Sequence, residues 1–109
     1  MLINLTPHRI IFPNNRIIES AGSARCELSE QSEWVDGVHS RFRTYGEVHG
    51  LPDCEDGKFY IVSNVVRWAL PERYDLCSPY RINRNPKDGL MYAEGLIFNT
   101  PNERNLKNE

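Results

Sequence analysis

The sequence has few cysteines, few lysines and no long hydrophobic run. Its three cysteines, an odd number, show no C-x-x-C spacing, so we expect neither a disulfide framework nor a structural zinc site. No stretch approaches the roughly 18 apolar residues of a membrane span. The first residues also lack a basic segment followed by an apolar one, and we therefore expect a soluble cytosolic protein with no export signal.

A strong excess of charge of either sign is also missing, because the net charge is −2. A near-neutral chain is not expected to bind nucleic acid in general, and it is too weakly acidic to act as a DNA mimic. Ten of the 13 basic residues are Arg, whose planar fork of donors suits carboxylate or phosphate. This excess favours a few specific anion or protein contacts, although biased genomic base composition predicts the same excess.

The length of 109 residues, with 39% hydrophobic residues, predicts one small domain with a modest core. We place the globular domain at residues 1–98. Residues 99–109 contain Leu106 as their one large apolar residue, and we expect a flexible tail there.

Short β-rich segments separated by turn residues predict most of the fold. The expected strands span residues 2–5, 9–12, 16–19, 24–28, 38–49, 58–62, 80–84 and 90–98, with hairpins at 9–19 and 80–98. Ser63 is expected to cap a helix over residues 64–70, which Pro71 ends, with Arg67 off its apolar side. The polar, acidic stretch 29–37 is interpreted as an exposed connection, in which Trp34 either covers the edge of the core or contacts a partner. Together these elements predict an α+β fold, a mostly antiparallel sheet of six to eight short strands with one short helix.

Residues 38–49 alternate strictly between two kinds of side chain. Alternate residues of a strand point to opposite faces, so one face is polar and the underside is small or apolar. The polar face consists of His39, Arg41, Arg43, Tyr45, Glu47 and His49, and the underside of Val38, Ser40, Phe42, Thr44, Gly46 and Val48.

The polar face is the best candidate for a binding surface. Arg41 and Arg43 are spaced to clamp the phosphates of a nucleotide-type ligand, with Tyr45 stacking on its base. Glu47 is placed to bind a sugar hydroxyl or a base amine. The alternative is a solvated face whose charges pair with neighbouring strands.

Three further residues are assigned to the same site: His8, Arg73 and Arg84. Arg84 begins the last hairpin and is expected to extend the positive surface, whereas His8 and Arg73 each have an ordinary structural alternative. His8 follows Pro7 in a loop and is typical of a turn, while Arg73 is spaced to form an ion pair with Asp75.

No catalytic residue, metal site or cofactor is expected. The three histidines never occur in a metal-ligand spacing, and no Gly-Lys-Ser/Thr follows the glycines of residues 45–50. Ser63 lacks the flanking glycines of a nucleophile elbow, so capping explains it better. The acids at 53–56 are interpreted as solvated loop charges.

Four segments, taken in order along residues 2–98, carry a resemblance. They are Asn4-Leu-Thr-Pro-His8, Thr44-Tyr-Gly-Glu-Val-His-Gly-Leu-Pro52, Tyr60-Ile-Val-Ser63 and Pro71-Glu-Arg-Tyr-Asp-Leu76, followed by Pro79 and Gly95-Leu96. Their order resembles a family of small, mostly uncharacterised proteins of tailed bacteriophages and prophages. The resemblance implies a setting, the cytoplasm of a bacterial host, but no reaction, cofactor or binding residue.

From the face and the setting we expect a non-enzymatic phage accessory protein with a counter-defence role. It would sequester an anionic nucleotide-type ligand, and a homo-oligomer is expected to complete the pocket. One alternative is an inhibitor that binds a host or defence protein directly through Trp34, Tyr74 and Tyr80. Another is a small hydrolase of nucleotide derivatives with His8 or Glu47 as base.

Overall fold

The computed structural model describes residues 1–101 and contains eight strands, one α-helix and one 3-10 turn. The elements are β1 (Leu2–Asn4), β2 (Ile10–Phe12), η1 (Pro13–Asn15), β3 (Arg16–Ile18), β4 (Arg25–Val35), β5 (Val38–His49), β6 (Phe59–Ile61), α1 (Asn64–Ala69), β7 (Leu76–Arg84) and β8 (Met91–Phe98). This confirms a strand-rich chain with one short helix. No helix within these 101 residues has the length and apolarity to cross a membrane.

Six strands form one mixed sheet in the order β1-β6-β7-β8-β2-β3. The two predicted hairpins are present, since β2 pairs antiparallel with β3 and β7 with β8. The expectation of a mostly antiparallel sheet is wrong, because β1 with β6, β6 with β7 and β2 with β8 are parallel pairs. Turn residues reveal hairpins, whereas parallel pairs join segments far apart in the sequence and leave no local signal.

The mixed sheet carries apolar side chains on both faces, as the alternation along β6 and β7 requires. Tyr60 and Leu76 belong to a cluster that also contains Leu5, Ala24, Val62 and Val66 of α1. Their neighbours Ile61 and Cys77 point to the other face, where they pack with Ile10 and Ala93. The body of the molecule is therefore a sheet with a helix against one of its faces.

The helix begins where the sequence predicts. The hydroxyl oxygen of Ser63 accepts a hydrogen bond from the backbone N–H of Val66 at 3.3 Å, and Pro71 follows the last turn. Arg67 does not lie off the buried side as expected. It is buried, and it donates to the Ser78 hydroxyl at 2.8 Å and to the Asn99 side-chain oxygen at 3.3 Å.

Asn99 belongs to the folded body, although the sequence assigns it to the tail. Its side chain is 5% exposed, and its amide donates to the backbone oxygens of Arg67, Leu70 and Arg73. One side chain thereby satisfies carbonyls that the end of a helix leaves without partners. The rest of the expected tail, from residue 102 on, lies outside the described residues.

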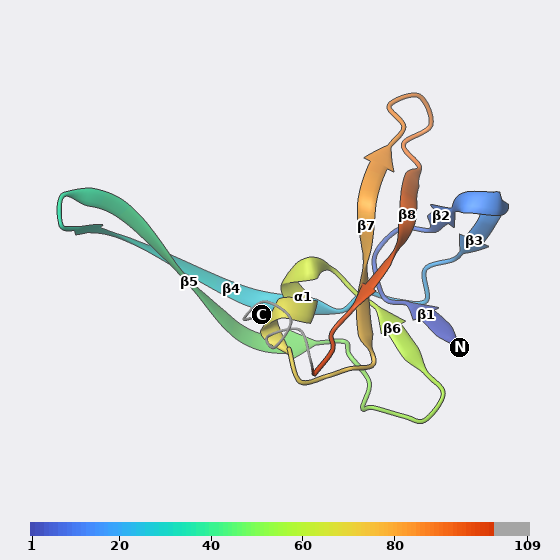
Figure 1. Cartoon of the computed structure of the whole chain (residues 1–109), viewed down its shortest axis with the longest axis horizontal. Coiled ribbons are helices and arrows are strands. Elements are labelled where there is room, and N and C mark those ends of the chain that lie inside the picture. Colours follow the sequence, from blue (N-terminus) through green and yellow to red (C-terminus); the bar gives the residue numbers. More distant parts are fainter. Residues whose placement is uncertain (102–109) are drawn as a thin grey trace.

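The other two strands, β4 and β5, form a long hairpin that we call the arm (residues 25–49). Figure 1 shows the arm projecting from the mixed sheet, with α1 near its base. Its strands of 11 and 12 residues would extend over roughly 35 Å at about 3.3 Å per residue. At the base, Cys26 and Val48 pack against the core, and beyond them almost every residue is exposed.

The arm confirms strand 38–49 and overturns the exposed connection at 29–37. Residues 29–35 are the second half of β4, paired with β5 up to Val35 opposite Val38. The turn is Asp36-Gly37, with φ of 48° and 78°. Two positive φ values are what a two-residue type I′ hairpin requires, and Asp-Gly is a strong sequence signal for it. The polar composition of 29–37 concealed the strand because it has no buried face.

Candidate functional site

The polar face of β5 is solvent-exposed along the arm. Arg43 Nη2 lies 3.2 Å from Glu30 Oε1 on the paired strand, and both side chains are about half exposed. This hydrogen bond raises the pKa of Arg43. Arg41 lies opposite Ser32, and Tyr45 lies opposite Leu28. Arg41, Arg43, Tyr45 and Glu47 line none of the four main cavities within residues 1–101. The cavity on the arm, about 500 Å³ at its base, is lined instead by Arg25, Cys26, Glu27 and His49.

The apolar underside of the arm is also uncovered. Val38 is 63% exposed and Phe42 is 47% exposed, and Val35 joins them from β4. Between these residues the underside carries small or uncharged polar side chains, and Glu33 is its one acid. An isolated two-stranded ribbon with both faces in water is marginally stable. The underside of the arm is therefore an apolar surface that the described fold leaves uncovered.

Glu47 meets two other side chains at the base of the arm. An irregularity in register between Cys26 and Leu28 brings Glu27 beside it, and the ligand atoms of Glu27, Glu47 and His49 all lie within 4.8 Å of one another. His49 Nε2 and Glu27 Oε1 are 3.2 Å apart. Two carboxylates and an imidazole have the chemistry of a divalent-cation site, but all three residues are exposed, and they form a surface cluster.

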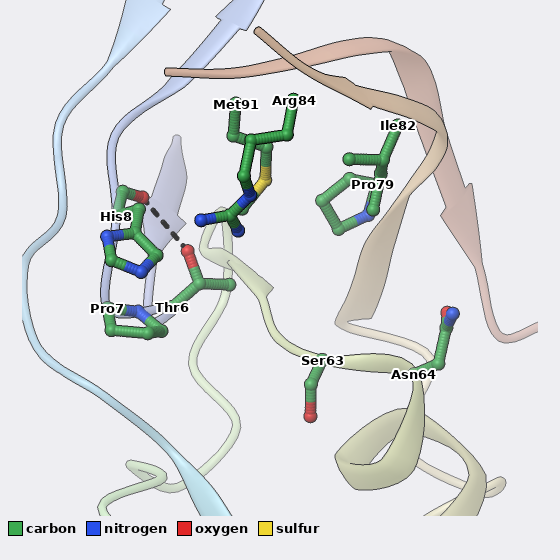
Figure 2. A pocket seen from close by; sticks show the side chains of 9 residues that line it. All are labelled: Thr6, Pro7, His8, Ser63, Asn64, Pro79, Ile82, Arg84 and Met91. Atoms are coloured by element: carbon green, nitrogen blue, oxygen red, sulfur yellow. Dashed lines mark hydrogen bonds between the residues drawn. The ribbon is translucent and has the colours of Figure 1, made fainter. Parts of the chain in front are cut away.

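His8 and Arg84 do come together, at a pocket in the body (Figure 2). The cavity has a volume of about 400 Å³ and lies between the loop after β1, the start of α1, and the β7–β8 hairpin. Its lining residues are Thr6, Pro7, His8, Ser63, Asn64, Pro79, Ile82, Arg84 and Met91. None of the nine is acidic.

The loop that forms one wall of this pocket is held by Asn4, which is fully buried. The Asn4 amide donates to the backbone oxygens of His8 at 2.9 Å and Ile18 at 3.1 Å. Its side-chain oxygen accepts from the backbone N–H of Thr6 at 3.0 Å and lies 2.6 Å from the Thr6 hydroxyl. Ser20 donates to the Thr6 carbonyl oxygen at 2.6 Å. The wall is thus fixed before any ligand arrives.

Arg73 lies apart from the other predicted residues and forms the ion pair that the sequence offers as its alternative. Its Nε and Nη2 donate to the two carboxylate oxygens of Asp75 at 2.9 and 2.7 Å. Nη2 also donates to the Pro52 carbonyl oxygen at 3.1 Å. The hydrogen bond from Arg73 lowers the pKa of the Asp75 carboxyl. A bidentate pair of this kind fixes the loop after α1 and leaves Arg73 little capacity for another anion.

The three aromatic residues of the protein-inhibitor alternative are all exposed, but they do not share a surface element. Trp34 is 73% exposed near the tip of the arm, with its ring centroid 5.3 Å from that of His39. The expectation that Trp34 covers the core edge is therefore wrong. Tyr74 follows the helix and Tyr80 lies in β7.

The groups named for hydrolysis have no partner that would activate a nucleophile. Within residues 1–101, neither the His8 ring nor the Glu47 carboxylate hydrogen-bonds to a hydroxyl or thiol. Cys77 is buried, donates to the Tyr60 carbonyl oxygen at 3.5 Å, and burial raises its thiol pKa to about 12. A thiol held neutral in this way is inert.

Several residues of the pocket and the arm were missed in the sequence. Pro79, Ile82 and Met91 carry no functional signal, because it is the pairing of β7 with β8 and of β8 with β2 that brings them beside His8. Glu27 could have been found, since an Asp36-Gly37 turn fixes which residue of β4 opposes each residue of β5.

Comparison of the chain with protein-family models, with curated proteins and with solved structures finds no match. The likeness to small phage proteins therefore stays a prediction from the sequence.

Proposed function

We propose that this chain is a non-enzymatic binding protein of bacteriophage type whose arm captures a protein in the cytoplasm of a bacterial host. The observation that carries the proposal is the uncovered apolar underside formed by Val35, Val38 and Phe42. A partner that is part of host defence would make the protein an inhibitor, and the phage resemblance of the sequence supports that setting.

The energetics of the arm favour a macromolecular partner. Burying apolar surface stabilises a complex by about 25 cal/mol per Å², and Phe42 supplies a rigid aromatic anchor on the underside. Trp34 lies opposite His39 on the other face of the arm. Within residues 1–101, the outer edges of β4 and β5 have no neighbouring strand. Their free backbone groups are suited to pairing with a strand of another protein.

Small-molecule capture on the arm has less support. Two guanidiniums bind phosphate strongly when the site excludes water, and Arg41 and Arg43 line none of the four main cavities within residues 1–101. The charges of the polar face are better explained as the polar rim of a protein interface, where Arg is common. Sequestration of a nucleotide-type ligand remains the second candidate, because His8 and Arg84 share a pocket elsewhere in the body.

The experiment compares three baits in pull-downs from a susceptible bacterial host. The arm variant carries Val38→Ser and Phe42→Ser. The control carries Ile17→Ser, which removes a similarly exposed apolar side chain (48% exposed) from edge strand β3. We expect the wild-type and control baits to capture the same protein and the arm variant to lose it, with direct binding of the purified pair as confirmation.

Light scattering on the same three proteins tests whether a second copy of the chain covers the underside of the arm. A wild-type dimer that the arm variant dissociates would mean that a second copy covers the underside and would contradict capture of a host protein by this face. Equal capture by all three baits would also contradict the proposal. Circular dichroism of each variant checks that the body remains folded.

A further inference from the structure

We propose that the pocket between the Thr6–His8 loop and the β7–β8 hairpin binds a nucleoside monophosphate, with Arg84 and His8 at the phosphate and Asn64 at the base. This site lies in the body, away from the arm, and does not depend on the proposed protein capture.

Arg84 supplies the charge. It makes no hydrogen bond or ion pair with any residue of the described chain, whereas Arg81, three positions earlier in β7, pairs with Glu94 at 3.1 Å. Figure 2 shows the Arg84 side chain reaching toward Thr6 and His8 at one end of the cavity. With no acid in the lining, this end is electropositive, and a guanidinium with free donors binds phosphate through paired hydrogen bonds.

The other end of the pocket offers a neutral donor. The Asn64 side-chain oxygen accepts from the Ser78 hydroxyl at 2.6 Å, so its NH₂ group is left for a ligand. Figure 2 places Asn64 at the opposite end from Arg84, whereas the Ser63 hydroxyl caps α1 and points away from Arg84. An amide donor at this end suits a carbonyl oxygen of a base such as uracil.

The walls between the two ends are apolar. Pro7, Pro79, Ile82 and Met91 line the cavity, and Met adapts its shape to a flat ring. A volume of about 400 Å³ lies in the range of small-ligand pockets, roughly 300–1,000 Å³, and toward its small end. A cationic end, an apolar middle and a neutral hydrogen-bonding end match a mononucleotide better than a bare anion or a sugar phosphate.

Preorganisation supports binding at this place. Three contacts of Asn4 hold Thr6 and His8, a fourth ties Asn4 to Ile18, and the Ser63 cap holds the opposite wall. A ligand that enters a fixed pocket loses less free energy to ordering of the protein than one that must fold a loop around itself.

The test is isothermal titration with UMP, uridine and inorganic phosphate against the full-length protein and two variants. We expect UMP to bind at least about tenfold more tightly than either fragment, because the phosphate and the base are recognised at separate ends. Arg84→Gln should weaken UMP binding by about tenfold or more. Arg81→Gln, the matched control on the same strand, should change it by less than about twofold.

Amide chemical shifts locate the ligand. UMP should shift the signals of residues 6, 8, 63, 64, 84 and 91 and leave those of the arm unchanged. The proposal is overturned if UMP fails to bind at about 1 mM. It is also overturned if phosphate alone binds as tightly as UMP, if Arg84→Gln binds like wild type, or if the shifted signals lie in residues 38–49.

Discussion

The mixed sheet and the arm are both built of β-strands, but they differ in what covers the side chains. In the body, β6 and β7 place residues such as Ile61 and Leu76 in full burial on opposite faces. In the arm, Phe42 and Val38 occupy equivalent alternating positions and remain 47% and 63% exposed. The same β pattern therefore gives a core in one region and a free surface in the other. The difference is set by the neighbours that the fold supplies and not by the strand itself.

Polar contacts also differ between the two regions. In the body, every buried side-chain nitrogen or oxygen of residues 1–101 has a hydrogen-bond partner. Asn4 and Asn99 use theirs to hold backbone carbonyls. On the arm, the pair of Arg43 and Glu30 is solvent-exposed, where ion pairs contribute little to stability.

The largest expected difference in stability comes from truncating one apolar side chain in each region. Leu76→Ala should lower the free energy of unfolding by about 2–5 kcal/mol, because it empties a fully buried position. Phe42→Ala should lower it by less than about 1 kcal/mol. Urea denaturation of both variants gives the two values. Comparable losses would show that Phe42 is buried in solution by a second copy.

The next effect concerns the wall of the pocket. Asn4→Ala removes four hydrogen-bonding contacts inside the body and should cost about 2 kcal/mol, because it leaves buried backbone groups unsatisfied. The matched change Asn83→Ala, at an exposed position of β7, should cost less than about 0.5 kcal/mol. Thermal unfolding measures both. If the two variants have the same melting temperature, the loop at residues 6–8 does not depend on Asn4.

A pH-dependent effect follows from Asp75. Its pKa is lowered in the folded protein by Arg73, so the unfolded chain binds the proton more readily. The stabilisation is therefore complete above the unfolded pKa of about 3.9 and is lost as pH falls through the folded pKa.

The measurement compares wild type with Asp75→Asn in urea at several pH values. At pH 7 the wild type should be more stable by about 2 kcal/mol, the contribution of hydrogen bonds between charged groups. This advantage should shrink below about pH 4. Arg73→Gln should reproduce the loss at neutral pH. If the stability advantage of the wild type grew as the pH fell, it would contradict a lowered pKa of Asp75 in the folded protein.

The smallest effect is expected at the tip of the arm. Trp34→Ala should leave the free energy of unfolding within about 0.5 kcal/mol of wild type, because the side chain is already 73% exposed. A loss above about 1 kcal/mol would show that the indole is covered in solution. The same variant should leave capture by the underside unchanged, because Trp34 lies opposite His39 on the other face of the arm.

Local structure could be predicted from the sequence wherever it depends on residues close together in the chain. The turns at 13–15 and 85–89, the Ser63 cap, the stop at Pro71 and the ion pair of Arg73 with Asp75 all depend on residues a few positions apart. Strand 38–49 was predicted with its correct limits from alternation alone. Strand 29–35 was not, because without a buried face it has no apolar alternation.

The candidate sites required information that no local pattern contains. Of the seven residues predicted to bind a ligand, His8 and Arg84 share a pocket, four lie on the arm, and Arg73 is held by an acid. Their separation follows from which strands pair, and three of the five pairings in the large sheet are parallel and long-range.

The sequence by itself determined the turns, the helix and the two-faced strand at 38–49, because these depend on backbone preferences and side-chain alternation over a few residues. The tertiary structure decided that the apolar face of that strand is left in water and that residues 8 and 84 meet at one cavity. Both outcomes depend on contacts between distant segments, whose free energies depend on the whole packed arrangement rather than on any one stretch of the chain.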